Sequence, residues 1–197
     1  MSIWPRRRPA VPGYARAWLD LGERVLTFAS TAYGDLVVAT PRGLWITNHG
    51  PAATDLEGSA ASRETDEPAH APGGRRLPWE FIVTAKWAGN ALTVTSAEEV
   101  APQIMKRLPS VTLVLPEPAD LPRVVRQRVD RSVAASYRRP LSAGATVLLV
   151  ARRVGGRDGL LWYAVFDRDS DTENPEARRQ ATALLESAAS AASMAAP

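Results

Sequence analysis

The sequence contains no cysteine, only two histidines and only two lysines, Lys86 and Lys106. Without cysteine, a disulfide framework and any thiolate-bound zinc or iron–sulfur site are excluded, and a reducing compartment is favoured. The basic complement is therefore almost entirely arginine. Arginine suits the recognition of phosphate and carboxylate groups, but together with many alanines it is equally typical of GC-rich coding.

Long apolar runs are also missing. The longest, such as residues 145–151, are far shorter than the roughly 20 residues of a membrane-spanning helix. The arginines at positions 6–8 are not followed by the apolar stretch of a secretory signal. We therefore expect a cytoplasmic protein without a transmembrane segment.

The motifs of common catalytic sites are absent: there is no P-loop, no dinucleotide-binding glycine pattern and no nucleophile elbow. His49 and His70 both fall in or beside a polar segment that cannot hold them for acid–base work or metal binding. We predict a protein that is not an enzyme and has no cofactor. An enzyme would need a deep pocket with convergent polar groups, which a sequence does not reveal.

An acidic stretch near the C-terminus has the alternation of a calcium-binding loop. Its acidic residues are Asp167, Asp169, Asp171 and Glu173. Thr172 stands where such a loop needs glycine, and Arg178 stands where it needs a bidentate glutamate. We therefore predict a solvated acidic turn and no metal site.

The length of 197 residues and a hydrophobic content of 45% predict one domain, with an appendage. Short apolar runs with a two-residue period predict β-strands over 24–30, 36–40, 44–47, 77–87, 91–95 and 111–115. The second and third should pair antiparallel through a tight turn at 41–43. Pro78 is compatible only with a strand start or an edge.

Between these strands, residues 48–76 are rich in Gly, Pro and polar residues and predict a long disordered loop that is dispensable for folding. Residues 98–108 are compatible with either a helical turn or a short edge strand. Trp79 and Trp87 lie eight residues apart, so a continuous strand 77–87 would place both on one face. We expect that face to be the core.

A helix is predicted over 120–139, with Asp120 as its cap and Pro140 as its end. Its apolar side consists of Leu121, Val124, Val125, Val129 and Val133. Arg128 lies within that stripe, so it should extend its head to solvent or meet a carboxylate.

Residues 1–19 are predicted to form a basic, proline-containing tail, and residues 191–197 a frayed tail. Between residues 140 and 190 the sequence predicts a hairpin of strands 146–154 and 160–167, followed by a helix that begins at Asn174 and Pro175. Residues 20–139 would form one domain, and 140–190 would pack on it or extend it.

Six short strands closed by an amphipathic helix, with residues 76–82 (RLPWEFI) opening the long middle strand, resemble bacterial pleckstrin-homology-like barrels. The chain as a whole also resembles uncharacterised actinobacterial proteins of similar length. The barrel resemblance covers about residues 20–139. It implies an α+β fold, with a small antiparallel β-barrel closed by a helix. That family has seven strands, and its phosphoinositide-binding members carry basic residues in the first strand connection, which is Thr31–Asp35 here. Phosphoinositide binding is therefore not expected.

Two functional hypotheses remain. The first is a non-catalytic binding or scaffolding module that contacts another protein through a strand edge or a groove beside the helix. The alternative is a nucleic-acid-associated protein that uses the arginine-bearing helix 120–139. The candidate interaction surface comprises Arg123, Arg126, Arg131, Arg138 and Arg139. Steep weakening by salt would distinguish phosphate binding from an apolar groove.

Overall fold

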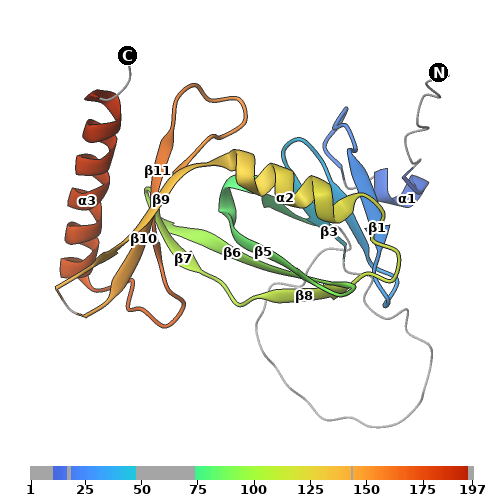
Figure 1. Ribbon diagram of the computed structural model, residues 1–197, viewed down its shortest axis with the longest axis horizontal. Coiled ribbons are helices and arrows are strands. Elements are labelled where there is room, and N and C mark those ends of the chain that lie inside the picture. The colour runs from blue at the N-terminus through green and yellow to red at the C-terminus, as the bar shows by residue number, and fades with distance from the viewer. Residues whose placement is uncertain (1–10, 17–18, 48–73, 143, 195–197) are drawn as a thin grey trace, which may run out of the picture.

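The computed structural model describes residues 11–16, 19–47, 74–142 and 144–194. Within these ranges the chain is an α+β protein with a small antiparallel sheet, a larger curled mixed sheet, and helices that include a long one at the C-terminal end (Figure 1). None of its described helices is long and apolar enough to cross a membrane.

The small sheet has the order β1-β2-β3-β4, with neighbours antiparallel. Its strands are β1 (Thr27–Ser30), β2 (Leu36–Ala39), β3 (Gly43–Ile46) and β4 (Arg75–Pro78). The predicted pairing of the second and third strands is confirmed. So is the edge position of Pro78, because β4 ends the sheet. Gly43 is required where β3 meets β4, since a Cβ there would lie 2.5 Å from the Leu77 carbonyl oxygen.

The strand predicted over 77–87 is not continuous. A single 3₁₀ turn, Trp79–Phe81, separates β4 from β5 (Ile82–Ala88), so Trp79 and Trp87 do not share one strand face. The predicted loop 48–76 also ends too late, because Arg75 and Arg76 pair with β3. The rest of that loop, residues 48–73 with both histidines, lies outside the described residues.

The larger sheet runs β5-β6-β7-β11-β10-β9, and β8 also pairs with β6. Its further strands are β6 (Ala91–Ala101), β7 (Ile104–Arg107), β8 (Val111–Val114), β9 (Val133–Pro140), β10 (Thr146–Arg152) and β11 (Leu161–Phe166). The β7–β11 pair is parallel and the others are antiparallel, so the sheet is mixed rather than purely antiparallel.

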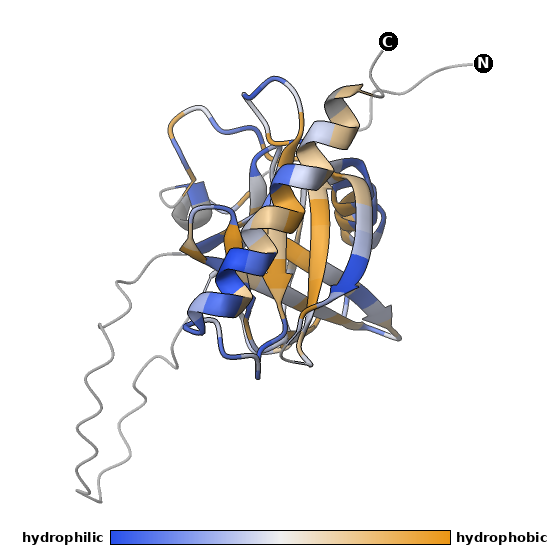
Figure 2. Cartoon of the chain, turned by 90° about the vertical axis from the view of Figure 1, so that its left-hand side faces the viewer, coloured by the Kyte–Doolittle hydropathy of each residue, from blue (hydrophilic) through white to orange (hydrophobic). Residues whose placement is uncertain are grey.

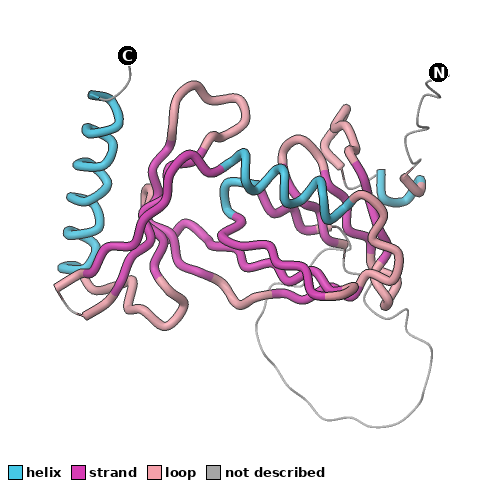
Figure 3. Tube along the Cα trace, viewed as in Figure 1, coloured by secondary structure: helices cyan, strands magenta, loops and turns pink. Residues whose placement is uncertain are grey.

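The ambiguous residues 98–108 form strand, not a helical turn. They supply the end of β6 and all of β7, and β7 lies between β6 and β11 rather than at an edge. One half of β6 pairs with β5 and β8, and its other half pairs with β7. We call the part with β1–β5, β8 and α2 (Leu121–Ser132) the first half of the molecule and the part with β7, β9–β11 and the C-terminal helix the second half. β6 runs through both halves (Figure 3).

Helix α2 (Leu121–Ser132) is shorter than the predicted helix 120–139, because residues 133–140 form β9 and pair along β10. The sheet hydrogen bonds override the helical spacing that includes Val133. Asp120 occupies the N-cap position without a side-chain cap bond, since its carboxylate accepts from Arg123 Nη2 at 3.0 Å. The apolar stripe is confirmed up to Val129 and faces the core.

The described residues form four hydrophobic clusters, and the two largest are the main cores of the molecule. The first lies between the small sheet, the β5–β6–β8 region and α2, and its largest buried members include Leu44, Trp79, Ile82, Leu92 and Leu115. Trp87 packs against it from a partly buried position. Both tryptophans therefore contact the core, as predicted, although from different elements.

The second core lies between β10, β11 and helix α3 (Pro175–Met194). Figure 2 shows α3 lying across hydrophobic strands. The predicted hairpin and the predicted start of α3 are confirmed: Asn174 Oδ1 accepts from the backbone N–H of Glu176 at 2.9 Å and of Ala177 at 3.2 Å. The helix continues through Met194, so residues 191–194 of the predicted frayed tail are helical in the structure, and their fraying stays a prediction. Residues 195–197 lie outside the described residues.

The end of the predicted N-terminal tail packs on the protein. Val11 is buried and contacts Leu36, Val38 and Trp45 on the outer side of the small sheet, next to the short helix α1 (Gly13–Arg16). The basic stretch 6–8 lies outside the described residues. Helices α1 and α3 lie at opposite ends of the molecule (Figure 1).

Candidate functional site

The five arginines predicted as one surface are divided among separate places. Arg123 and Arg126 border a groove beside α2, and Arg131 lines a pocket at the other end of that helix. Arg123 pairs with Asp120, which raises the pKa of its guanidinium through a hydrogen bond and opposite charge. Arg126 Nε lies 3.7 Å from Asp130 Oδ2.

The other two predicted arginines are on β9, in the half of the molecule that contains α3. Arg138 Nη1 lies 3.5 Å from Asp167 Oδ2, and Arg107 of β7 reaches the same carboxylate at 3.1 Å. The Arg139 guanidinium lies 4.8 Å from the centre of the Tyr137 ring. The prediction of a single helix carrying all five arginines is therefore wrong, because the helix ends at Ser132.

The acidic stretch is engaged in local contacts. Asp171 Oδ1 accepts from the backbone N–H of Glu173 at 2.9 Å, and Glu173 pairs with Arg178 at 2.7 Å. In the part of the chain that the structure describes, no cluster of three or more His, Cys, Asp or Glu side chains is arranged to hold a metal ion.

A groove of about 610 Å³ lies between α2 and β5. Its apolar lining comprises Ala85, Trp87, Pro122, Val125 and Val129, and its polar lining comprises Arg123, Arg126 and Asp130. The Trp87 Nε1–H is buried and has no hydrogen-bond partner among the described residues. Among the residues that the structure describes, β5 is an edge strand that pairs only with β6, so its other edge has no partner strand there.

A second pocket, of about 370 Å³, lies where the two halves of the molecule meet. We call it the arginine pocket. It is lined by the β2–β3 turn (Pro41, Arg42), β4 (Arg76, Pro78), the 3₁₀ turn after β4 (Trp79, Glu80), the end of α2 (Arg128, Arg131, Ser132) and the residues after β10 (Arg153, Val154, Gly155). Among the described residues, its lining contains five arginines and one glutamate.

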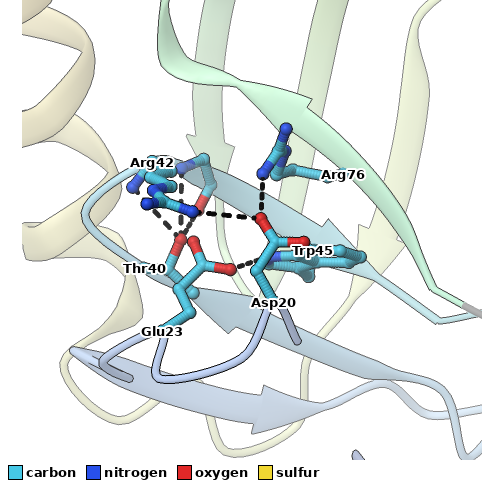
Figure 4. Close-up of polar contacts among 7 residues, drawn as sticks. Asp20, Glu23, Thr40, Arg42, Trp45 and Arg76 are labelled. Carbon is cyan, nitrogen blue, oxygen red and sulfur yellow. Dashed lines mark hydrogen bonds and ion pairs between the residues drawn. The ribbon is translucent and has the colours of Figure 1, made fainter. Parts of the chain in front are cut away.

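One wall of the arginine pocket is fixed by Asp20. Its carboxylate pairs with both Arg42, at 3.3 Å, and Arg76 (Figure 4). Arg76 also lies over the Trp45 ring, 5.7 Å from its centre. The neighbouring turn is held by Thr40 Oγ1, which accepts from the backbone N–H of Arg42 at 3.3 Å. Both guanidinium groups of this wall are therefore oriented by partners outside the pocket.

The opposite wall has no such carboxylate. Among the residues that the structure describes, none pairs an acid with Arg128, Arg131 or Arg153. Arg153 Nη1 lies 3.4 Å from the carbonyl oxygens of Arg131 and Val133, at the end of α2. The pKa of Arg128 is lowered, first by burial and then by the positive charges of Arg131 and Arg24.

Arg152, which sequence reasoning missed, lies beneath this wall and is only 2% exposed. Nη1 donates to Ser132 Oγ at 2.7 Å and Nη2 donates to the Ile82 carbonyl at 2.8 Å, whereas Nε has no partner among the described residues. Burial lowers its pKa to about 10, against the favourable charge of Glu80. The signal that could have found it is a lone arginine in the apolar run 146–152. It ties β10 to β5 and α2.

Comparison with known proteins gives no relative for these sites: no family model, no curated protein and no solved structure matches the chain. The resemblance to pleckstrin-homology-like barrels and to actinobacterial proteins stays a prediction. The candidate sites rest on the geometry of the groove and of the arginine pocket.

Proposed function

We propose that the chain is a non-catalytic binding or scaffolding module with a pleckstrin-homology-like barrel in its first part. Seven strands support this fold proposal: β1 to β4 form one sheet, β5, β6 and β8 form a second layer, and α2 closes the core between them. Strand β7 and the pairing of β7 with β11 depart from the expected plan, because they join this part to the β9–β11 sheet.

The partner in this proposal is an extended segment of another protein, bound in the groove between α2 and β5. The observation that carries it is an edge strand lying beside a groove with an apolar floor. A peptide strand can add its backbone hydrogen bonds to such an edge while alternate side chains enter the groove. Apolar side chains of the bound segment would contact Trp87 and Val129 and bury them.

The charge of the groove selects the chemistry of the segment. Arg123 and Arg126 lie on its rim, and Lys86 is exposed on β5. Asp120, which pairs with Arg123, and Asp130, 3.7 Å from Arg126, oppose part of this charge. We propose a segment with alternating apolar residues and at least one acidic residue, because rim charges of opposite sign favour encounter and register.

The test is selection of ten-residue peptides from a displayed library, followed by fluorescence polarisation with the selected peptide. Trp87→Ala should weaken binding by at least about tenfold, as expected for an aromatic anchor worth about 2 kcal/mol. Tyr33→Ala is the matched control, since Tyr33 is 82% exposed and does not line the groove. Unchanged affinity in a folded Trp87→Ala protein would refute the groove proposal.

Salt dependence separates this proposal from the nucleic-acid alternative. Peptide binding through an apolar groove should change little between 50 and 200 mM salt, whereas contacts to several phosphates lose about 10³-fold or more over that range. Binding of duplex DNA that exceeds peptide binding and falls steeply with salt would favour the alternative. The absence of catalysis stays a prediction in both cases.

A further inference from the structure

The arginine pocket has no role in peptide binding by the groove, and its composition points to a different ligand. We propose that it binds a small soluble molecule that carries two or more phosphate groups. The proposal rests on the convergence of Arg42, Arg76, Arg128, Arg131 and Arg153 from segments that are distant in the sequence.

The charge of the pocket is not balanced by the residues that line it. Glu80 is the only acid among the described residues of the lining. Asp20 serves both Arg42 and Arg76, so these two guanidinium groups share one carboxylate. The opposite wall contributes three arginines without any carboxylate partner among the described residues. A planar guanidinium with several fixed N–H donors matches phosphate oxygens in a bidentate manner.

Two arginines of that wall also have a structural task. Arg153 donates toward the carbonyls at the end of α2, and Arg131 stands in the last turn of the helix, where a cation is favoured by the helix dipole. Arg128 lies a turn earlier. Neither a bond to the helix-end carbonyls nor a place in the last turn explains its position. Burial, and then repulsion from Arg131 and Arg24, disfavour its charge, and a bound anion would offset that repulsion. A substitution of Arg128 therefore tests anion binding without removing a cation that stabilises the end of α2.

The size and the apolar part of the pocket favour a small ligand. A volume of about 370 Å³ is at the lower end of the range of small-molecule sites, roughly 300–1,000 Å³. Pro41, Pro78, Trp79 and Val154 provide apolar surface between the two arginine walls. Arg138 and Arg139 lie elsewhere, on β9, so these arginines do not continue into the stripe that a nucleic-acid backbone would follow.

Isothermal titration calorimetry with inorganic tripolyphosphate and with ADP tests the proposal on the full chain at 50 mM salt. We expect saturable binding of both, weakened at least tenfold by Arg128→Gln. Arg126→Gln is the matched control, because it removes the same charge from the same helix at a position 85% exposed outside the pocket. Arg42→Gln, on the other wall, should weaken binding as well, and it tests the proposal if Arg128→Gln does not fold.

Further arms identify the ligand class. Trp87→Ala should bind tripolyphosphate like the wild type, so that failure of the groove proposal and failure of this one are distinguishable. Equal losses in Arg126→Gln and Arg128→Gln would show bulk charge attraction and overturn the proposal, as would the absence of saturable binding. Tighter binding to phosphoinositide vesicles or to duplex DNA than to either soluble probe, lost in Arg128→Gln, would also overturn it by assigning the pocket to a macromolecular surface.

Discussion

The two halves of this protein cover a sheet with a helix in different ways. In the half closed by α2, branched residues such as Leu121 and Val125 meet a core that contains Trp79. In the other half, α3 presents Ala177 and Ala181 to the strands. Large side chains keep a helix farther from the sheet, whereas alanine allows close approach. Both candidate binding sites border α2.

The comparison predicts that the first core depends on single large side chains. Trp79 is buried and its Nε1–H donates to the Thr40 carbonyl at 3.0 Å. Trp79→Ala should lower the free energy of unfolding by about 3–5 kcal/mol, through lost burial and the cavity. Chemical denaturation measures this. Trp87→Ala is the control with a smaller loss, because Trp87 is only partly buried; equal losses would contradict the distinction.

The second half should instead be sensitive to added volume. Ala181 is fully buried between α3 and the strands. Ala181→Leu should destabilise the protein by about 1–3 kcal/mol, since overpacking forces side chains off their rotamers. Ala183→Leu, on the exposed side of the same helix, should change stability by less than about 0.5 kcal/mol. Thermal melts of both variants decide whether α3 packs as closely as its alanines indicate.

Arg152, which ties β10 to β5 and α2, should have a smaller effect on the free energy of unfolding, and that effect should depend on pH. Burial lowers the pKa of Arg152 to about 10 in the folded protein, below the pKa of a solvent-exposed guanidinium, so the folded state loses this proton first as pH rises. The unfolded state then binds more protons, and stability from this group increases above pH 10.

The free energy of unfolding of the wild type, measured relative to that of Arg152→Met, should therefore increase by about 1 kcal/mol between pH 8 and pH 11. Tyr163, whose pKa is raised chiefly by burial, contributes the opposite trend, and its charge interacts with that of Arg152, so the same pair should also be compared in a Tyr163→Phe background. Urea denaturation at each pH measures the gain. A constant difference would mean that Arg152 keeps its charge throughout this range.

Local signals in the sequence predicted much of the fold. Strand alternation, the 41–43 turn and the Asn174 cap depend on neighbouring residues, and each appears in the structure. The errors arise where distant pairing decides. Residues 133–140 keep helical spacing through Val133 but pair with β10, and β7 gains its central place only from β11.

The candidate sites were harder to predict for the same reason. Arg126 and Arg131 are close in sequence, which predicts a shared surface, yet they belong to different sites. No local pattern in the sequence marks Arg42, Arg76 and Arg153, because only the fold brings them together. The pattern of residues within one segment does not show that arginines from distant segments will line the same pocket.

The parallel pairing of β7 with β11 has a consequence for how the chain is made. On the ribosome, all strands of the small sheet and the whole of α2 emerge before residue 161, where β11 begins. Until then β7 is an open edge, which is a template for pairing with another chain. Fragments that stop near Pro140 would keep that edge permanently. We therefore expect the hairpin of β10 and β11 to protect the nascent chain from aggregation by covering this edge. Expression of residues 20–139 alone should require a chaperone or a solubilising fusion.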